Sequence, residues 1–287
     1  MQQKNPMVAV VTGASRGAGR GIAAALGQYG ATVYVTGRTM RAGEAALPGT
    51  ILETAEAVTQ AGGRGIAVQV DHADDAAVAA LFRRVEEEQG RLDLLVNNVA
   101  HIDDQLIEPG PFWEKSLSLA NILDVGLRSQ YVASYHAAPL MARQKSGLIV
   151  FTSSFGSNCY MHGPAYGAQK AGVDKMAYDM SIDLQDHGVA VVSIWMGILA
   201  TERTKASALA RPDEYGHALE IAETPEFTGR LIARIFEDPN RMDLTGKVLI
   251  GAEQALSYGL MDEGGRQPVS HRPMLGGPPA YHPAIVR

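Results

Sequence analysis

The chain has 287 residues, 46% of them apolar and 20% charged, which is enough to bury a sizeable core in one large α/β domain. A net charge of −6 without a basic run gives no reason to expect a nucleic-acid partner. Cys159 is the single cysteine, which excludes an intrachain disulfide and favours a reducing cytoplasm. No apolar stretch reaches the roughly 20 residues that span a bilayer, so we expect no membrane partner and a cytoplasmic location.

Short apolar runs alternate with amphipathic stretches along the chain. The runs predict buried strands at residues 8–12, 32–36, 65–70, 92–96, 147–152, 190–195 and 247–250. The amphipathic stretches predict helices at residues 20–29, 51–60, 75–89 and 165–187. This alternation predicts a doubly wound parallel sheet with helices on both faces, which is a Rossmann-type α/β fold of about seven strands.

No linker in the sequence is long enough to divide domains. We therefore expect one domain over residues 1–287, with its core at about 7–250 and a C-terminal extension at about 251–287. Three segments are predicted to be additions to the sheet. They are a loop-rich stretch at 102–118, a polar stretch at 200–227 where a substrate lid would lie, and an irregular tail from residue 262.

Three glycines follow the first predicted strand. Gly13, Gly17 and Gly19 have the spacing Gly-x3-Gly-x-Gly, which differs from the Gly-x-Gly-x2-Gly of the general dinucleotide fingerprint. Glycine lets the backbone turn tightly and approach a ligand, and the following helix offers free N–H groups and a positive dipole end to a pyrophosphate. A ligand-free strand–helix turn is the alternative, but the position after the first strand favours phosphate binding.

A tyrosine and a lysine are candidates for acid–base chemistry. Tyr166 and Lys170 lie four residues apart on a predicted helix and therefore share one face. A phenol with a pKa near 10 transfers protons poorly at neutral pH, and a neighbouring ammonium favours its phenolate. Ser153 ends the fifth predicted strand, thirteen residues before Tyr166, at the sheet edge where such folds bind ligands. Ser154 is the competing serine, and a surface pair with a turn-capping serine is the alternative for the whole set.

Together these motifs resemble the short-chain dehydrogenase/reductase family. Its cofactor turn is similar to residues 12–19, and its Asn-Asn-Ala-Gly segment is similar in part to Asn97-Asn98-Val99-Ala100. The resemblance implies that Ser153 binds the substrate carbonyl oxygen and that Tyr166 delivers the proton. It also implies that Lys170 binds the nicotinamide ribose and stabilises the phenolate. Hydride would pass directly between the cofactor and a carbonyl or secondary alcohol substrate.

The end of the second predicted strand bears on the choice of cofactor. NAD enzymes place a carboxylate there for the ribose 2′-hydroxyl, whereas a 2′-phosphate needs a cation. Gly37 stands where the family has an aspartate, and Arg38 with Arg16 would form a fork around the phosphate, the alternative being two solvated arginines. We therefore expect NADP(H) rather than NAD. The cofactor-binding residues that the resemblance implies are Gly13, Ser15, Arg16, Gly17, Ala18, Gly19, Arg38, Asp71, His72, Asn98, Tyr166, Lys170, Gly197, Ile198 and Thr201.

Two positions depart from the family pattern. Gly126 stands where many members have an asparagine, which leaves two alternatives. If that asparagine acts through its backbone carbonyl on a relay water, glycine keeps the function, whereas a side-chain role would be lost. After the sixth strand, Met196 replaces the usual proline, but Gly197 and Thr201 remain, so Thr201 is a candidate nicotinamide contact.

Local segments resemble one subgroup more closely. Phe112-Trp113-Glu114, residues 125–128, residues 244–249 and the tail around residues 258–266 are similar to the subgroup called dehydrogenase/reductase SDR family member 1. That subgroup is similar to reductases that act on steroids and other carbonyl compounds. The family commonly pairs the helices at 124–142 and 165–187 between subunits, which implies a homodimer or homotetramer.

The substrate pocket is predicted to be apolar. Phe155, Cys159, Met161 and Met196 fall in loops expected to face the nicotinamide, although apolar residues at strand ends are as often core. The histidines, His101 and His162 among them, form no metal-ligand spacing, so we expect no catalytic metal and structural roles for these two near the cleft. A dinucleotide sensor without turnover and a sugar-nucleotide epimerase remain as alternatives. The retained Tyr166 and Lys170 disfavour the sensor, and the glycine spacing disfavours the epimerase.

Overall fold

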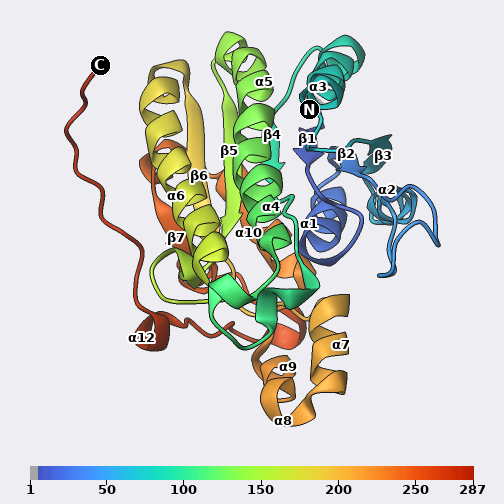
Figure 1. The fold of residues 1–287 in the computed structure, drawn as a ribbon. Coiled ribbons are helices and arrows are strands. Elements are labelled where there is room, and N and C mark those ends of the chain that lie inside the picture. Colours follow the sequence, from blue (N-terminus) through green and yellow to red (C-terminus); the bar gives the residue numbers. More distant parts are fainter. Residues whose placement is uncertain (1–5) are drawn as a thin grey trace.

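The computed structural model describes residues 6–287, and its centre is a sheet of seven parallel strands (Figure 1). The strand order is β3-β2-β1-β4-β5-β6-β7, which confirms the doubly wound fold that the alternating pattern predicts. The strands are β1 (Val8–Val11), β2 (Thr32–Gly37), β3 (Arg64–Gln69), β4 (Leu94–Asn97), β5 (Gly147–Ser153), β6 (Val189–Trp195) and β7 (Val248–Ile250).

Helices cover both faces of the sheet. Helices α1, α2, α10 and α11 enclose one apolar core, and α3, α5 and α6 enclose the other (Figure 1). The helices are α1 (Gly17–Gln28), α2 (Ile51–Gln60), α3 (Asp75–Gln89), α4 (Asn121–Leu123), α5 (Ser129–Gln144), α6 (Pro164–Leu184), α7 (Glu202–Ala210), α8 (Pro212–Tyr215), α9 (Ala218–Ile221), α10 (Pro225–Glu237), α11 (Gly251–Ser257) and α12 (Arg272–Leu275). None of the helices in the described range is long and apolar enough to cross a membrane.

Local capping explains why two helices begin where the sequence predicts. Thr50 accepts a hydrogen bond from the Glu53 backbone N–H, and the Glu53 carboxylate accepts one from the Thr50 N–H, which forms a capping box at the start of α2. Asp74 caps α3 by accepting from the N–H groups of Ala76 and Ala77. The predicted bounds 51–60 and 75–89 are therefore those of α2 and α3.

The three predicted additions to the sheet have more local structure than their composition indicates. The stretch at 102–118 contains 3-10 turns at Asp104–Ile107 and Phe112–Glu114 and the start of a third at Leu117–Ala120. Helices α7, α8 and α9 occupy the predicted lid and lie beyond the carboxyl ends of the strands (Figure 1). The tail is irregular except for α12 and one 3-10 turn, and its Tyr281 ring packs on Tyr178 of α6 with centroids 4.9 Å apart.

Candidate active site

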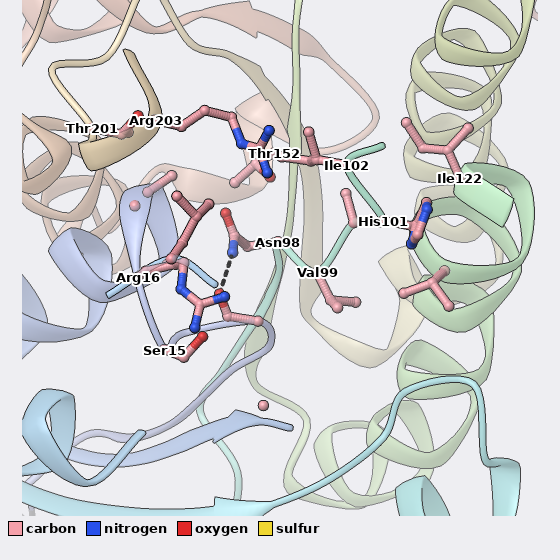
Figure 2. A pocket seen from close by; sticks show the side chains of 18 of the residues that line it. Ser15, Arg16, Asn98, Val99, His101, Ile102, Ile122, Thr152, Thr201 and Arg203 are labelled. Carbon is pink, nitrogen blue, oxygen red and sulfur yellow. Dashed lines mark hydrogen bonds between the residues drawn. The ribbon is translucent and has the colours of Figure 1, made fainter. Parts of the chain in front are cut away.

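A cavity of about 580 Å³ lies at the carboxyl ends of the central strands. Its lining runs from the glycine turn, through Asn98 after β4, to Tyr166 and Lys170 on α6. Figure 2 shows Ser15, Arg16 and Thr201 around one part of this cavity and His101 and Ile122 around another. This is the sheet edge at which doubly wound folds bind ligands.

The glycine turn has the form of an anion site. Gly13 and Gly17 have φ angles of 65° and 56°, which L side chains rarely adopt, and a Cβ on Gly13 would lie 2.7 Å from the Cα of Val99. Helix α1 starts at Gly17 without a side-chain cap, and the Gly17 N–H donates instead to the Glu202 carboxylate at 3.1 Å. That carboxylate stands in for an anion at a helix N-terminus, so the donors present fit a pyrophosphate.

Asn98, which follows β4, is hydrogen-bonded to the backbone of the glycine turn. Its side-chain amide donates to the backbone oxygens of Thr12 at 2.9 Å and Gly13 at 3.2 Å. Figure 2 shows the Asn98 side chain on the wall of the cavity. The Thr12 hydroxyl in turn accepts from the N–H groups of Asn98 and Val99. The role of Asn98 visible in the contacts is therefore to hold the glycine turn against the end of β4.

The two arginines of the predicted phosphate fork differ in their surroundings. Arg16 donates to the carbonyl oxygens of Pro48 and Gly49 and to the Thr39 hydroxyl, at 3.0 to 3.1 Å, so the loop before α2 holds it in place. Arg38 lines the same cavity and is exposed. Arg38 is thus the arginine whose head is available to a ligand, while Arg16 fixes the wall beside it.

Two residues after β3 line the cavity next to these arginines. Asp71 is exposed and accepts from the Ala73 N–H, which is a turn contact. His72 is buried with its Nε2 atom 2.8 Å from the Thr36 hydroxyl. Burial lowers the pKa of His72 to about 4, so the ring is neutral at physiological pH.

Tyr166 meets a serine hydroxyl at the opposite end of the cavity. The Ser154 Oγ atom lies 2.9 Å from the Tyr166 hydroxyl oxygen, and the Lys170 ammonium lies 5.4 Å from the centre of the Tyr166 ring. The Lys170 ammonium also donates to the Thr152 carbonyl oxygen at 3.3 Å. A Cβ on Gly156 would lie 2.6 Å from the Tyr166 ring, so only glycine leaves room for the ring here.

The placement of Ser153 differs from the prediction. Its side chain is fully buried at the end of β5, and its Oγ atom lies 3.4 Å from the Lys170 carbonyl oxygen. Successive residues of an extended chain point to opposite sides, so Ser153 faces the interior against α6 while Ser154 faces Tyr166. The hydroxyl that we expected from Ser153 beside the tyrosine is that of Ser154.

Burial dominates the titration of both α6 residues. It raises the pKa of Tyr166, although the hydrogen bond with Ser154 acts in the opposite direction. It lowers the pKa of Lys170 to about 8, against the favourable charge of Asp174 one turn later. At pH 7 the lysine therefore still carries a proton, and its charge is held in a region that solvates it poorly.

Two further residues of α6 support this arrangement, and sequence reasoning missed both. Asp174 is buried and accepts from the Ser193 hydroxyl at 2.5 Å and the Trp195 indole at 2.7 Å. Its position four residues after Lys170 places it on the same helix face, and this spacing could have identified it as a partner of the lysine. Gln169 donates to the carbonyl oxygen of Gly126 at 2.7 Å, at a kink between α4 and α5. The backbone carbonyl on which the relay alternative depends is thus bonded to Gln169.

The loop after β6 presents only some of its predicted residues to the cavity. Met196, Leu199 and Thr201 line the cavity, and Thr201 also caps α7 by accepting from the Thr204 N–H. Gly197 lies on the far side, where its N–H donates to the Glu223 carboxylate at 3.3 Å. Ile198 accepts from the Glu223 N–H through its backbone oxygen.

Glu223 is a buried acid that sequence reasoning did not single out. It is 2% exposed, and burial raises its pKa to about 7. Since its backbone and its carboxylate both bond to the loop after β6, it holds that loop from behind. The burial of Glu223 depends on tertiary contacts, and nothing in the local sequence marks this residue as buried.

Three apolar residues predicted to face the nicotinamide pack elsewhere. Phe155 is buried against Trp195, with ring centroids 4.9 Å apart, and Cys159 and Met161 join the same cluster. They therefore contribute to a small core under the C-terminal extension rather than to the cavity wall. Of the four candidates, Met196 lines the cavity.

The histidines near the cleft contact neighbouring side chains. His162 has a φ of 57° and stacks edge-on against Tyr166 with centroids 5.1 Å apart. Burial, together with the charge of Lys115, lowers the pKa of His162. The Nε2 atom of His101 lies 3.9 Å from the Asp103 carboxylate.

The chain is similar in sequence to short-chain dehydrogenases. Residues 7–211 match the family model described as short chain dehydrogenase. Over 304 aligned positions the chain is 40% identical to human dehydrogenase/reductase SDR family member 1, which covers 99% of this chain and 94% of the human protein. It is also 30% identical to the 2-dehydro-3-deoxy-D-gluconate 5-dehydrogenase of Pseudoalteromonas atlantica, covering 88% of this chain and 90% of that protein.

Solved structures show the same similarity. A structure described as a short-chain alcohol dehydrogenase from Sinorhizobium meliloti has a TM-score of 0.73 at 27% identity, covering 86% of this chain and 95% of that one. A structure described as an NAD(P) dependent gluconate 5-dehydrogenase from Beutenbergia cavernae, with bound NADP at low occupancy, has a TM-score of 0.70 at 29% identity. That similarity covers 85% of this chain and 94% of the Beutenbergia chain.

Proposed function

The chain belongs to the short-chain dehydrogenase/reductase family, and from that premise we propose that it is an NADP(H)-dependent oxidoreductase acting on a carbonyl or secondary alcohol. One observation carries the proposal. Tyr166 and Lys170 line a cavity that continues to the glycine turn, the Lys170 ammonium is 5.4 Å from the centre of the Tyr166 ring, and the Ser154 hydroxyl is 2.9 Å from the Tyr166 hydroxyl.

Tyr166 is the proposed acid and base. In the direction of reduction its hydroxyl gives a proton to the substrate oxygen, and in oxidation its phenolate accepts that proton. Burial raises its pKa, so it is protonated and ready to donate at neutral pH. The NADPH cofactor, when bound, would supply the hydride to the carbonyl carbon of the substrate, whose oxygen takes the Tyr166 proton.

Lys170 and Ser154 adjust what Tyr166 does. The Lys170 charge, buried on the same helix face, stabilises the phenolate that forms when the proton leaves. Ser154 lies within hydrogen-bond distance of the tyrosine hydroxyl, so a carbonyl oxygen placed beside both hydroxyls would accept a hydrogen bond from each. Ser154 thereby takes the orienting role that the family resemblance gave to Ser153.

The choice of NADP(H) rests on charge. The chain has Gly37 where a carboxylate would select NAD, and the exposed Arg38 beside it lines the cavity. The glycine turn would hold the pyrophosphate, and Thr201 and Lys170, which line the same cavity, would contact the nicotinamide and its ribose. The Beutenbergia relative with bound NADP lends support to this choice.

The remaining expectations extend the proposal. The substrate is a small carbonyl or alcohol compound with an apolar body. We propose a homodimer or homotetramer that is paired through α5 and α6. We also propose a cytoplasmic location, which is in keeping with the free Cys159.

The test is a fluorescence titration with NADPH and with NADH, followed by NADPH oxidation against a panel of ketones, quinones and steroids. The proposal expects tighter binding of NADPH and turnover of at least one carbonyl compound. Tight binding of cofactor without turnover of any compound would favour a dinucleotide sensor. Preference for NADH would overturn the role of Arg38.

A further inference from the structure

A second cavity, of about 300 Å³, adjoins the catalytic cavity. The two share Leu106 and His162 in their linings. The second cavity lies between the stretch before α4 and the start of α6, and Phe112, Trp113, Leu119, Tyr160 and Pro164 supply its apolar walls. Because His162 also stacks on Tyr166, this space begins at the residue next to the proposed proton donor.

Large aromatic side chains at this cavity are exposed. Phe112 is 61% exposed, Trp113 is 72% exposed and Tyr160 is 83% exposed. Phe112 and Trp113 contact each other edge to face, with centroids 5.3 Å apart. Clustered exposed aromatic surface beside a cavity is typical of a binding surface, because single exposed apolar residues are common and such groups are not.

One charged residue, Lys115, contributes to the lining of the second cavity. It is half-buried, and within residues 6–287 no carboxylate lies within salt-bridge distance of its ammonium. Two acids of the segment before Lys115 have other partners, since Asp104 pairs with Arg203 and Glu108 pairs with Arg211. Glu114 is exposed to solvent. The cavity therefore offers an unpaired cation at an apolar wall, which is an environment that strengthens its attraction for an anion.

We propose that the second cavity binds the distal part of the substrate, and that the substrate is a carbonyl compound with an aromatic or similarly flat apolar body ending in a carboxylate. The carbonyl lies at Tyr166, the apolar body passes His162 along Trp113 and Phe112, and the carboxylate pairs with Lys115. This inference rests on the proposed function and names its substrate class. It assigns the apolar recognition to the 112–120 segment, since Phe155, Cys159 and Met161 pack into a core instead.

Two acids and their methyl esters test this substrate class. The probes are 4-acetylbenzoate and 4′-acetylbiphenyl-4-carboxylate, each beside its ester, with acetophenone as the short neutral ketone. We expect kcat/KM for at least one acid to exceed that for its ester by about 10-fold, the factor typical of one charge-assisted contact. Lys115→Met should abolish this preference, and the matched control Lys175→Met, on the exposed face of α6, should keep it. Trp113→Ala should slow the acid and its ester alike and leave acetophenone unchanged.

A binding measurement separates failure of this inference from failure of the proposed function. Calorimetric titration with biphenyl-4-carboxylate, which has no ketone, should show binding that Lys115→Met weakens about 10-fold. Such binding without turnover of any ketone would overturn the enzyme and keep the cavity assignment. Acids no better than their esters, or a preference that survives in Lys115→Met, would overturn the inference. A change in oligomeric state alone in Trp113→Ala would also overturn it, since the cavity would then be a contact between copies.

Discussion

Replacing Lys170 by methionine is expected to separate stability from activity. The ammonium of Lys170 is buried beside Tyr166, and its hydrogen bond is to the single carbonyl of Thr152. Burial of a charge with one weak partner costs free energy, and the proposed function assigns this charge to stabilising the Tyr166 phenolate. Methionine has a similar length and no charge, so it removes the cost and the function together.

The magnitude follows from the pKa of this lysine. The pKa is lowered from 10.5 to about 8 in the folded chain. A difference of about 2.5 pH units corresponds to about 3 kcal/mol of unfolding free energy. Because the folded protein prefers the neutral amine, this cost is fully present below pH 8 and disappears as the pH rises to 10.5. The stabilisation by Lys170→Met should thus fall from about 3 kcal/mol at pH 7 to about 1 kcal/mol at pH 9.5.

The assay is urea unfolding without cofactor, at one protein concentration and at both pH values, because ligands and association shift apparent stability. The control is Lys175→Met, an exposed lysine of the same helix, which should change the unfolding free energy by less than about 0.5 kcal/mol. Ketone turnover should fall at least about 100-fold in Lys170→Met only. A Lys170→Met protein that is less stable than the wild type at pH 7 would refute the reasoning about the buried charge.

Three further changes test the site. In steady-state kinetics, Ser154→Ala should lower kcat about 100-fold while Ser153→Ala keeps most of it, because the Ser154 hydroxyl is the one beside Tyr166. The opposite ranking would make Ser153 the catalytic serine, as the spacing predicts. Arg38→Ala should weaken NADPH binding about 10-fold in a fluorescence titration and leave NADH binding unchanged, and equal losses for both would show that Arg38 does not read the 2′-phosphate. Glu202→Gln should tighten NADPH binding, because the carboxylate now competes for the N–H at the start of α1; weaker binding would mean that Glu202 helps to hold the cofactor.

The fold could be predicted because its signals are local. The alternation of apolar runs and amphipathic stretches predicts the seven parallel strands and the bounds of α2 and α3, and the structure shows that Thr50 and Asp74 cap these two helices. The 3-10 turns within 102–118 could not be predicted, since a turn of three or four residues has too few positions to show a period.

The site could be predicted in part. Spacing placed Tyr166 and Lys170 on one face. The residue count pointed to Ser153, whereas the hydroxyl beside Tyr166 is that of Ser154, because a shift of one in an extended chain reverses the direction of the side chain. Glu223 escaped notice because its burial and its contact with Gly197 depend on segments that meet only in the folded chain. Phe155 was assigned to the pocket because a strand-end apolar residue has the same local signal in a core.

The central claim is that Tyr166 transfers the proton in an NADPH-dependent reaction. The direct measurement compares the wild type with Tyr166→Phe, which removes one oxygen atom, and with Tyr29→Phe, at the exposed residue after the end of α1, as the control. NADPH affinity and the rate of NADPH oxidation by the best ketone are measured for all three. We expect unchanged NADPH affinity, a loss of turnover of at least about 100-fold in Tyr166→Phe and normal turnover in the control. Turnover that survives in Tyr166→Phe would contradict it.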